Sequence, residues 1–329
     1  MSINRTRSAG LARTLGLSAW GLCVALPFTP AMAQPESAPT PPPAITVPTD
    51  AELVKLAQDR YDRYTVPVHI GPTGPFRFLI DTGAERTILS HDTATRLGLS
   101  ATGTATVVGV AGARPVSIVE VDELSIGRRT FYGLSTPLLE SEYIGADGIV
   151  GVDSLQDQRV LIDFVSDRIA IGDAAKLGGA RGFEIVVSAR RKSGQLIMAD
   201  ARVDGIATSI VIDTGSDTSI GNLALRKALS RRVQTRPTTL LSVTGQSITA
   251  ELATTSLIEV GGVQLHNTPL AFADALAFHR LGLERKPAML MGMAQLRMFS
   301  RVAIDFSTRR ILFDLPTGVA TLDPIDIPF

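Results

Sequence analysis

An internal repeat restricts this chain to a fold built from two similar halves. The segment PFRFLIDTGAERTIL in the first half corresponds to ATSIVIDTGSDTSI in the second, which places Asp81 132 residues before Asp213. Further pairs of segments follow in the same order. They are VVGVAGARP and LLSVTGQSI, LSIG and IEVG, STPLL and NTPLA, GIVG and MLMG, and RVLIDFVSDRIAI and RVAIDFSTRRILF. Matching blocks in one order predict two homologous lobes in one polypeptide.

Within each half the residue pattern is typical of β structure. From Thr65 onward, short runs of alternating apolar residues are separated by Gly, Pro and Asp turns. We therefore expect a mainly β protein with lobes at 51–175 and 181–329, joined by the Ala- and Gly-rich stretch Asp173–Arg181. Ahead of the first lobe, the spacing of apolar residues predicts a short helix over Asp50–Arg63.

Residues 1–33 have the features of a secretory signal peptide. Arginines precede an apolar run from Leu15 to Phe28, and Ala31-Met32-Ala33 matches the small-x-small cleavage pattern. Since the run is too short to span a bilayer comfortably, we expect cleavage before Gln34 and a periplasmic or secreted protein without a stable membrane span. A signal retained as an anchor is the alternative. Residues 34–50 are Pro-rich and predict an extended linker.

Composition excludes several classes of function. Lys and Arg together number 32, which equals the number of Asp and Glu, so a nucleic-acid binder is not expected. The single cysteine, Cys23, lies inside the signal, and the four histidines are scattered without ligand spacing. The chain also has no GxSxG, HExxH or Gly-rich phosphate loop. We therefore predict no disulfide, no metal and no cofactor.

The repeated motif resembles that of the retropepsin-like aspartic protease family, most closely its bacterial exported branch. Two apolar residues, then Asp-Thr-Gly and Ala or Ser, are followed about seventy or eighty residues later by apolar-apolar-Gly. The likeness covers nearly all of the mature chain, twice. It implies two acid-protease barrel lobes related by a pseudo-twofold axis, with a central cleft. It also implies that Asp81 and Asp213 are the catalytic pair.

Physical chemistry explains why such a motif suits that role. Gly83 and Gly215 lack a Cβ, so the two loops can approach closely. Two carboxylates within hydrogen-bond reach share a proton, and one can then act as a base while the other acts as an acid. In the family, the hydroxyls of Thr82 and Thr214 bond across to the opposite loop and hold the pair rigid.

One difference between the two loops predicts an electrostatic asymmetry. Ala84 follows the first motif, whereas Ser216 follows the second. A serine can donate a hydrogen bond to its carboxylate and favour the ionised form, which alanine cannot do. This predicts that Asp213 is the more readily ionised of the two aspartates.

The remaining repeated blocks imply supporting roles. By resemblance, Val108–Ala113 and Leu241–Gln246 are hairpin flaps over the cleft, with Gly112 and Gly245 as their turn residues; ordinary surface hairpins are the alternative. The GIVG and MLMG segments imply a strand behind each catalytic loop. Asp163 and Asp305, in the last block, are by resemblance structural.

The second lobe has about nine more residues than the first between the NTPLA and MLMG segments. We expect a helix-containing insertion at 274–287. Decoration of the surface is the simpler interpretation, and a part in shaping the groove is the alternative.

The resemblance implies a hydrolase, an aspartic endopeptidase that binds polypeptide in an extended conformation and works as a monomer. A catalytically silent peptide-binding or scaffolding protein of the same fold is the alternative. A third arrangement, in which two chains pair to form the working site, is less simple than pairing within the chain.

Overall fold

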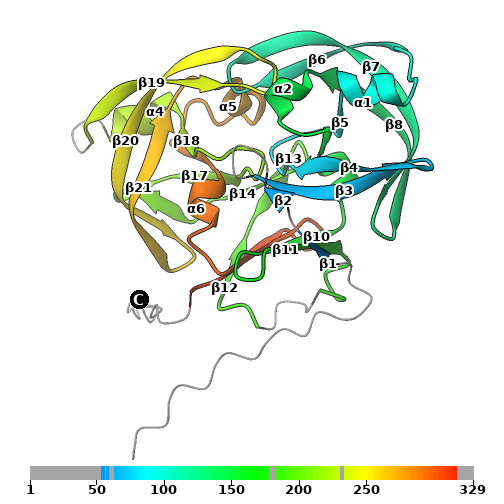
Figure 1. Ribbon diagram of the computed structural model, residues 1–329. Coiled ribbons are helices and arrows are strands. Elements are labelled where there is room, and N and C mark those ends of the chain that lie inside the picture. The colour runs from blue at the N-terminus through cyan, green and yellow to red at the C-terminus, as the bar shows by residue number, and fades with distance from the viewer. Residues whose placement is uncertain (1–52, 56, 59–62, 178–181, 230–232, 317–329) are drawn as a thin grey trace, which may run out of the picture. The chain divides into compact units, whose positions relative to one another are not determined.

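The computed structural model describes residues 53–55, 57–58, 63–177, 182–229 and 233–316 (Figure 1). These residues are mainly in β strands, which confirms the expected fold class. The predicted signal peptide, the Pro-rich linker and part of the stretch expected to join the lobes lie outside the described residues. None of the described helices is long and apolar enough to cross a membrane.

The first half forms an eight-stranded sheet in the order β2-β3-β4-β9-β5-β8-β7-β6. An additional pairing of β3 with β7 closes six of these strands into a ring, as expected for a barrel lobe. The strands are β2 (Ala57–Gln58), β3 (Tyr64–Ile70), β4 (Thr73–Ile80), β5 (Ile88–Ser90), β6 (Gly103–Gly109), β7 (Gly112–Ile126), β8 (Arg129–Leu139) and β9 (Gly148–Val150).

The second half repeats this arrangement, with its sheet in the order β13-β14-β17-β22-β18-β21-β20-β15-β16 and β19 paired with β20. The place of β3 is taken by two successive strands, β14 and β15, which pair with β17 and β20 respectively. The strands are β13 (Arg190–Lys192), β14 (Gln195–Met198), β15 (Ala201–Val203), β16 (Ile206–Ala207), β17 (Ser209–Ile212), β18 (Ile220–Gly221), β19 (Thr235–Leu241), β20 (Ser247–Val260), β21 (Val263–Phe272) and β22 (Ala288–Met291).

A third sheet joins the halves, in the order β1-β11-β10-β23-β24-β12. Its strands are β1 (Leu53–Lys55), β10 (Arg159–Asp163), β11 (Arg168–Gly172), β12 (Ile185–Ser188), β23 (Arg301–Asp305) and β24 (Arg310–Asp314). The homologous strands β10 and β23 pair antiparallel at its centre, with Arg159 opposite Asp305 and Asp163 opposite Arg301. This reciprocal register is what a pseudo-twofold axis between two repeats requires.

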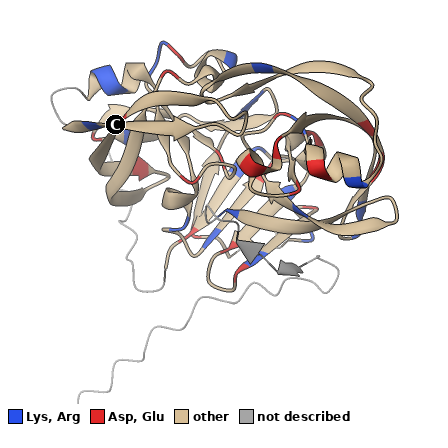
Figure 2. Cartoon of the chain, turned by 45° about the horizontal axis from the view of Figure 1, so that its top comes forward, with Lys and Arg blue, Asp and Glu red and all other residues tan. Residues whose placement is uncertain are grey.

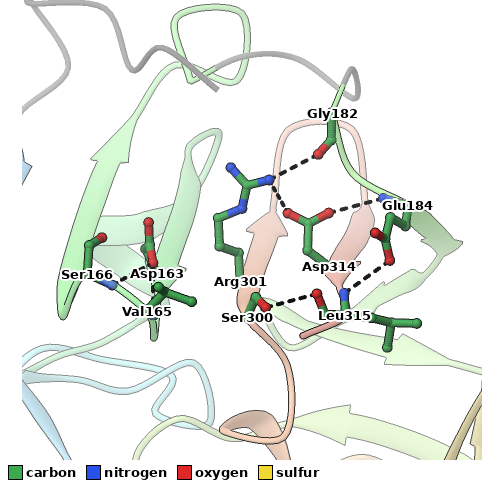
Figure 3. A network of polar contacts seen from close by, with 9 residues as sticks. All are labelled: Asp163, Val165, Ser166, Gly182, Glu184, Ser300, Arg301, Asp314 and Leu315. Atoms are coloured by element: carbon green, nitrogen blue, oxygen red, sulfur yellow. Dashed lines mark hydrogen bonds and ion pairs between the residues drawn. The ribbon is translucent and has the colours of Figure 1, made fainter. Parts of the chain in front are cut away.

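The two ends of the central pair differ in their polar contacts. Arg159 forms an ion pair of 2.8 Å with Asp305. At the other end, Arg301 turns to Asp314 of β24 and also donates to the carbonyl of Gly182, as Figure 3 shows. Asp163 instead accepts hydrogen bonds from the next turn, in which the backbone N–H groups of Val165 and Ser166 each lie 3.0 Å from its carboxylate (Figure 3).

The prediction of a helix over Asp50–Arg63 is wrong for the residues of this segment that the structure describes. Residues 53–55 form β1, which pairs with β11, and residues 57–58 form β2, which pairs with β3. Pairing of β1 with β11, which is distant in sequence, and of β2 with the neighbouring β3 outweighs the weak local preference for helix.

The helices are short and lie at strand ends: α1 (His91–Arg96), α2 (Ser141–Ile144), α3 (Val152–Leu155), α4 (Leu223–Ala228), α5 (Leu276–Arg280) and α6 (Met293–Leu296). Equivalent positions in the two halves carry α1 and α4, whose N-caps are Ser90 and Asn222. Helix α5 lies in the predicted insertion and confirms that it contains a helix.

Candidate active site

Each Asp-Thr-Gly motif follows directly on a strand whose last three residues are buried. Asp81 comes after β4 and donates its backbone N–H to the carbonyl of Val150 at 3.0 Å. Asp213 comes after β17 and makes the equivalent bond to Met291, also at 3.0 Å. The acceptors belong to β9 and β22, which run parallel to β4 and β17. The strand expected behind each loop is therefore present in both halves.

The two loops are tied to each other by their threonines. The hydroxyl of Thr82 donates to the carbonyl of Ile212 at 2.9 Å, and the hydroxyl of Thr214 donates to that of Ile80 at 2.7 Å. Each threonine also accepts from the backbone N–H of the other, at 3.1 and 3.3 Å. Because both side chains are buried, water does not compete for these bonds.

The glycines of the motifs pack against the opposite aspartate. A Cβ on Gly83 would lie 2.7 Å from Oδ1 of Asp213, and a Cβ on Gly215 would lie 2.2 Å from Cγ of Asp81. Real Cβ atoms do not make such contacts, so only glycine allows the two carboxyl groups to come this close to the facing loop.

A Gly215→Ala substitution is therefore expected to push the loops apart and to lower the free energy of unfolding by about 1–3 kcal/mol, as overpacking does. Gly172→Ala is the matched control, because a Cβ there would make ordinary contacts of 3.5 Å or more with Leu177. Urea denaturation of both variants measures the difference. Equal stability of the two would show that the loop contact is not tight.

The carboxyl groups of Asp81 and Asp213 lie close together, since a Cβ on Gly83 would lie 3.1 Å from Oδ1 of Asp81 and 2.7 Å from Oδ1 of Asp213. Asp213 is buried and Asp81 is partly buried. Burial raises the pKa of both. The negative charge of Asp81 raises the pKa of Asp213 further, while hydrogen bonds from the N–H groups of Gly83 (2.7 Å) and Ala84 (3.0 Å) oppose the rise in the pKa of Asp81. The pair therefore holds a proton that isolated aspartates would have lost.

The prediction that Asp213 is the more readily ionised partner is wrong. The hydroxyl of Ser216 donates to the carbonyl of Thr218 at 2.8 Å and not to the carboxylate. Asp213 accepts one backbone N–H, from Gly215 at 3.1 Å, whereas Asp81 accepts two. Since hydrogen bonds to a carboxylate stabilise its ionised form, Asp81 carries the negative charge and Asp213 the proton.

Both aspartates open into one cavity of about 620 Å³. Residues of both halves line it, among them Val108 and Gly109 at the end of β6 and Leu241 and Ser242 at and just after the end of β19. The arrangement can hold a chain segment against a proton-sharing pair of carboxyl groups.

A comparison with protein-family models agrees with this geometry. The model of a family described as aspartyl protease matches residues 66–154 and again residues 199–294, which together are more than half of the chain. The chain belongs to this family of retropepsin-like aspartyl proteases. Each matched region contains one Asp-Thr-Gly motif and the strand behind it. No curated protein matches the chain significantly.

The hairpins predicted as flaps are β6–β7 and β19–β20, and their tips meet. A Cβ on Gly109 would lie 2.1 Å from Oγ of Ser242, and Arg114 donates to the carbonyl of Thr244 at 3.1 Å. Gly112 and Gly245 both lie in these tips. Gly245 has φ +78°, which favours glycine, and packs against the ring of Tyr143.

The insertion of the second half is part of the site, so its interpretation as surface decoration is wrong. Ala277, Arg280 and Leu281 line the cavity. Arg280 also forms an ion pair of 2.9 Å with Glu85, which lies just after the first motif. The extra residues therefore reach the opposite half and form part of the cavity wall.

Two cavity residues escaped the sequence analysis. Arg63 donates to the carbonyl of Gly215 at 3.1 Å and to that of Ile144, and Gln195 donates to the carbonyl of Gly83. Both side chains are almost fully buried. The repeat could have identified both residues as equivalent, because each lies 18 positions before the aspartate of its own half.

Proposed function

We propose that the protein is an aspartic endopeptidase, in which Asp81 and Asp213 activate a water molecule for attack on a peptide bond. The observation that carries this proposal is that the carboxyl groups of Asp81 and Asp213 lie close together in one cavity, each at the end of its own Asp-Thr-Gly loop. Ionised Asp81 takes a proton from water, and protonated Asp213 donates to the carbonyl oxygen of the substrate. The bond from carbon to the amide nitrogen then breaks as the nitrogen gains a proton.

We further propose that the substrate is polypeptide in an extended conformation. Residues of β6 and β19 line the cavity, and each of these strands is paired on one side only, so the other edge offers backbone N–H and C=O groups for pairing with an extended segment. Acidic and basic residues are interspersed along the described chain in Figure 2, which gives no preference for a partner of one charge.

We also propose that the protein is exported, that residues 1–33 are removed, and that the mature chain is periplasmic or secreted. The signal-peptide features of the N-terminal sequence support this. Cell fractionation and N-terminal sequencing of the mature protein test this. A mature chain that begins at Gln34 is expected, and a full-length chain in the cytoplasm would contradict it.

Cleavage of an unfolded protein such as reduced casein tests the activity. The purified mature chain is assayed from about pH 4 to pH 7.5, with and without a pepstatin-type inhibitor, beside a size-exclusion run that reports the oligomeric state. Cleavage that the inhibitor blocks, by a monomer, is the expected result. A folded protein that binds the inhibitor but cuts nothing would favour the peptide-binding alternative.

A further inference from the structure

Arg63 and Gln195 occupy equivalent positions in the two repeats. Arg63 directly precedes β3, and Gln195 is the first residue of β14, the strand that takes the place of β3 in the second half. Each side chain crosses to the other half and donates to the carbonyl of the motif glycine there, Arg63 to Gly215 and Gln195 to Gly83. Together they form a second reciprocal contact between the loops, beside that of the threonines.

We propose that Arg63 and Gln195 are paired positioning residues that each hold the catalytic loop of the opposite half, and that the single positive charge of the pair, on Arg63, sets the pH range in which the aspartates work. This inference rests on the proposed peptidase function. The inference goes beyond the proposed peptidase function because it names two residues that act through the aspartates.

The contact of Gln195 acts on the peptide unit that supports Asp81. The carbonyl of Gly83 and the N–H of Ala84 belong to one peptide group, and that N–H donates to the Asp81 carboxylate at 3.0 Å. A hydrogen bond to the carbonyl fixes the plane of this group and polarises its N–H toward the carboxylate. Gln195 therefore positions a donor to the ionised aspartate without touching the aspartate itself.

The guanidinium of Arg63 adds a charge that the amide of Gln195 lacks. Its bonds to the carbonyls of Gly215 and Ile144 hold it in the cavity wall. Burial raises the pKa of both aspartates, and the positive charge of Arg63 lowers both again. A cation near two carboxyl groups favours loss of protons from the pair, so it moves both limbs of a pH-rate profile to lower pH.

Other charged and titratable groups line the same cavity, and several neutralise one another. They are Glu85, Arg86, Tyr143, Asp217 and Arg280. Glu85 is paired with Arg280 at 2.9 Å, and Asp217 is paired with Arg297 at 3.1 Å. Arg63 donates directly to the carbonyl of Gly215 in the second catalytic loop.

Exchanging residues between the two positions tests the proposal with matched variants. Arg63→Gln makes both positions neutral and is expected to move both limbs of the kcat/KM profile up by about one pH unit. Gln195→Arg makes both positions cationic and is expected to move the limbs down by about the same amount. The double exchange keeps one charge and is expected to return the limbs close to those of the wild type.

If Arg63 and Gln195 had a purely structural role, their substitution would lower kcat/KM without moving the limbs of its pH profile. Arg63→Lys, which keeps the charge with fewer donors, is expected to leave the limbs in place even if the rate falls. Thermal unfolding shows that each variant is folded. Limbs that stay fixed in folded Arg63→Gln and Gln195→Arg would overturn the proposal.

A second measurement is independent of turnover. The carboxyl carbons of Asp81 and Asp213 are titrated by ¹³C NMR in the wild type and in Arg63→Gln, with Asp81→Asn and Asp213→Asn used to assign the signals. An upward shift of the titration in Arg63→Gln supports the proposal even if no substrate is cut, whereas unchanged titrations overturn it. Failure of the peptidase proposal is thereby distinguished from failure of this one.

Discussion

Asp81→Asn and Asp213→Asn are each expected to lower kcat for peptide cleavage by roughly 10²–10⁴-fold or more, the contribution of general acid–base groups. Asparagine keeps the shape of the side chain but neither accepts a proton from water nor shares one with its partner. Since the two carboxyl groups lie in one cavity and the charge of one acts on the other, losing either one removes both halves of the mechanism. Steady-state kinetics with a fluorogenic peptide measures the loss.

The control for this prediction is Asp122→Asn. Asp122 is an exposed aspartate on β7 that does not line the cavity, so the same change of charge there is expected to leave kcat unaltered. Thermal unfolding of the three variants checks that all are folded. Activity retained in a folded Asp81 or Asp213 variant would place the chemistry elsewhere in the chain.

Asp305→Ala is expected to lower the free energy of unfolding by about 3–5 kcal/mol, the effect of breaking a buried ion pair. Asp305 is 0% exposed and Arg159, its partner across the central strand pair, is 2% exposed. Removing the carboxylate leaves the guanidinium buried without its counter-charge. The pair also joins β10 of one half to β23 of the other, so its loss loosens the sheet that unites the two halves.

Asp163→Ala is the matched control, since Asp163 holds the equivalent position in the first repeat. Among the described residues its carboxylate accepts from the adjacent turn, while its cross-strand neighbour Arg301 is paired with Asp314. A loss of about 1 kcal/mol is expected there, as for a surface hydrogen bond. Guanidinium chloride denaturation measures the free energy of unfolding of both variants. Equal losses would show that the ion pair between Arg159 and Asp305 adds nothing to stability.

The stabilisation by the ion pair of Arg159 and Asp305 depends on pH. Burial would raise the pKa of Asp305, but hydrogen bonds from Thr308, Ser307 and Arg159 outweigh burial and lower it. The stabilisation is therefore complete above the pKa of about 3.9 of an unfolded aspartate and is lost as the pH falls through the lowered pKa. The difference in stability between wild type and Asp305→Ala is accordingly expected to shrink in strong acid.

The two halves, the mainly β class, the two motif aspartates and the two hairpins that line the cavity could all be predicted from the sequence. These features depend on local patterns that occur twice: an apolar strand before Asp-Thr-Gly, a Gly-containing turn between alternating residues, and an apolar-apolar-Gly segment after them. A pattern that recurs in register gives the same local structure in both halves, because the same steric and burial preferences act on each copy.

The direction of individual side chains and the contacts between the two halves became visible only in the folded protein. Residues 53–55 became a strand because β11 lies beside them, and the hydroxyl of Ser216 turned to the carbonyl of Thr218 and away from Asp213. Helix α5 reached the cavity, and Arg63 and Gln195 crossed to the opposite loops. Most of these outcomes depend on partners that are distant in sequence, and all depend on the direction that a side chain takes or the surface that a strand meets. The apolar periodicity of a segment encodes neither the direction of a single side chain nor the surface that a strand meets.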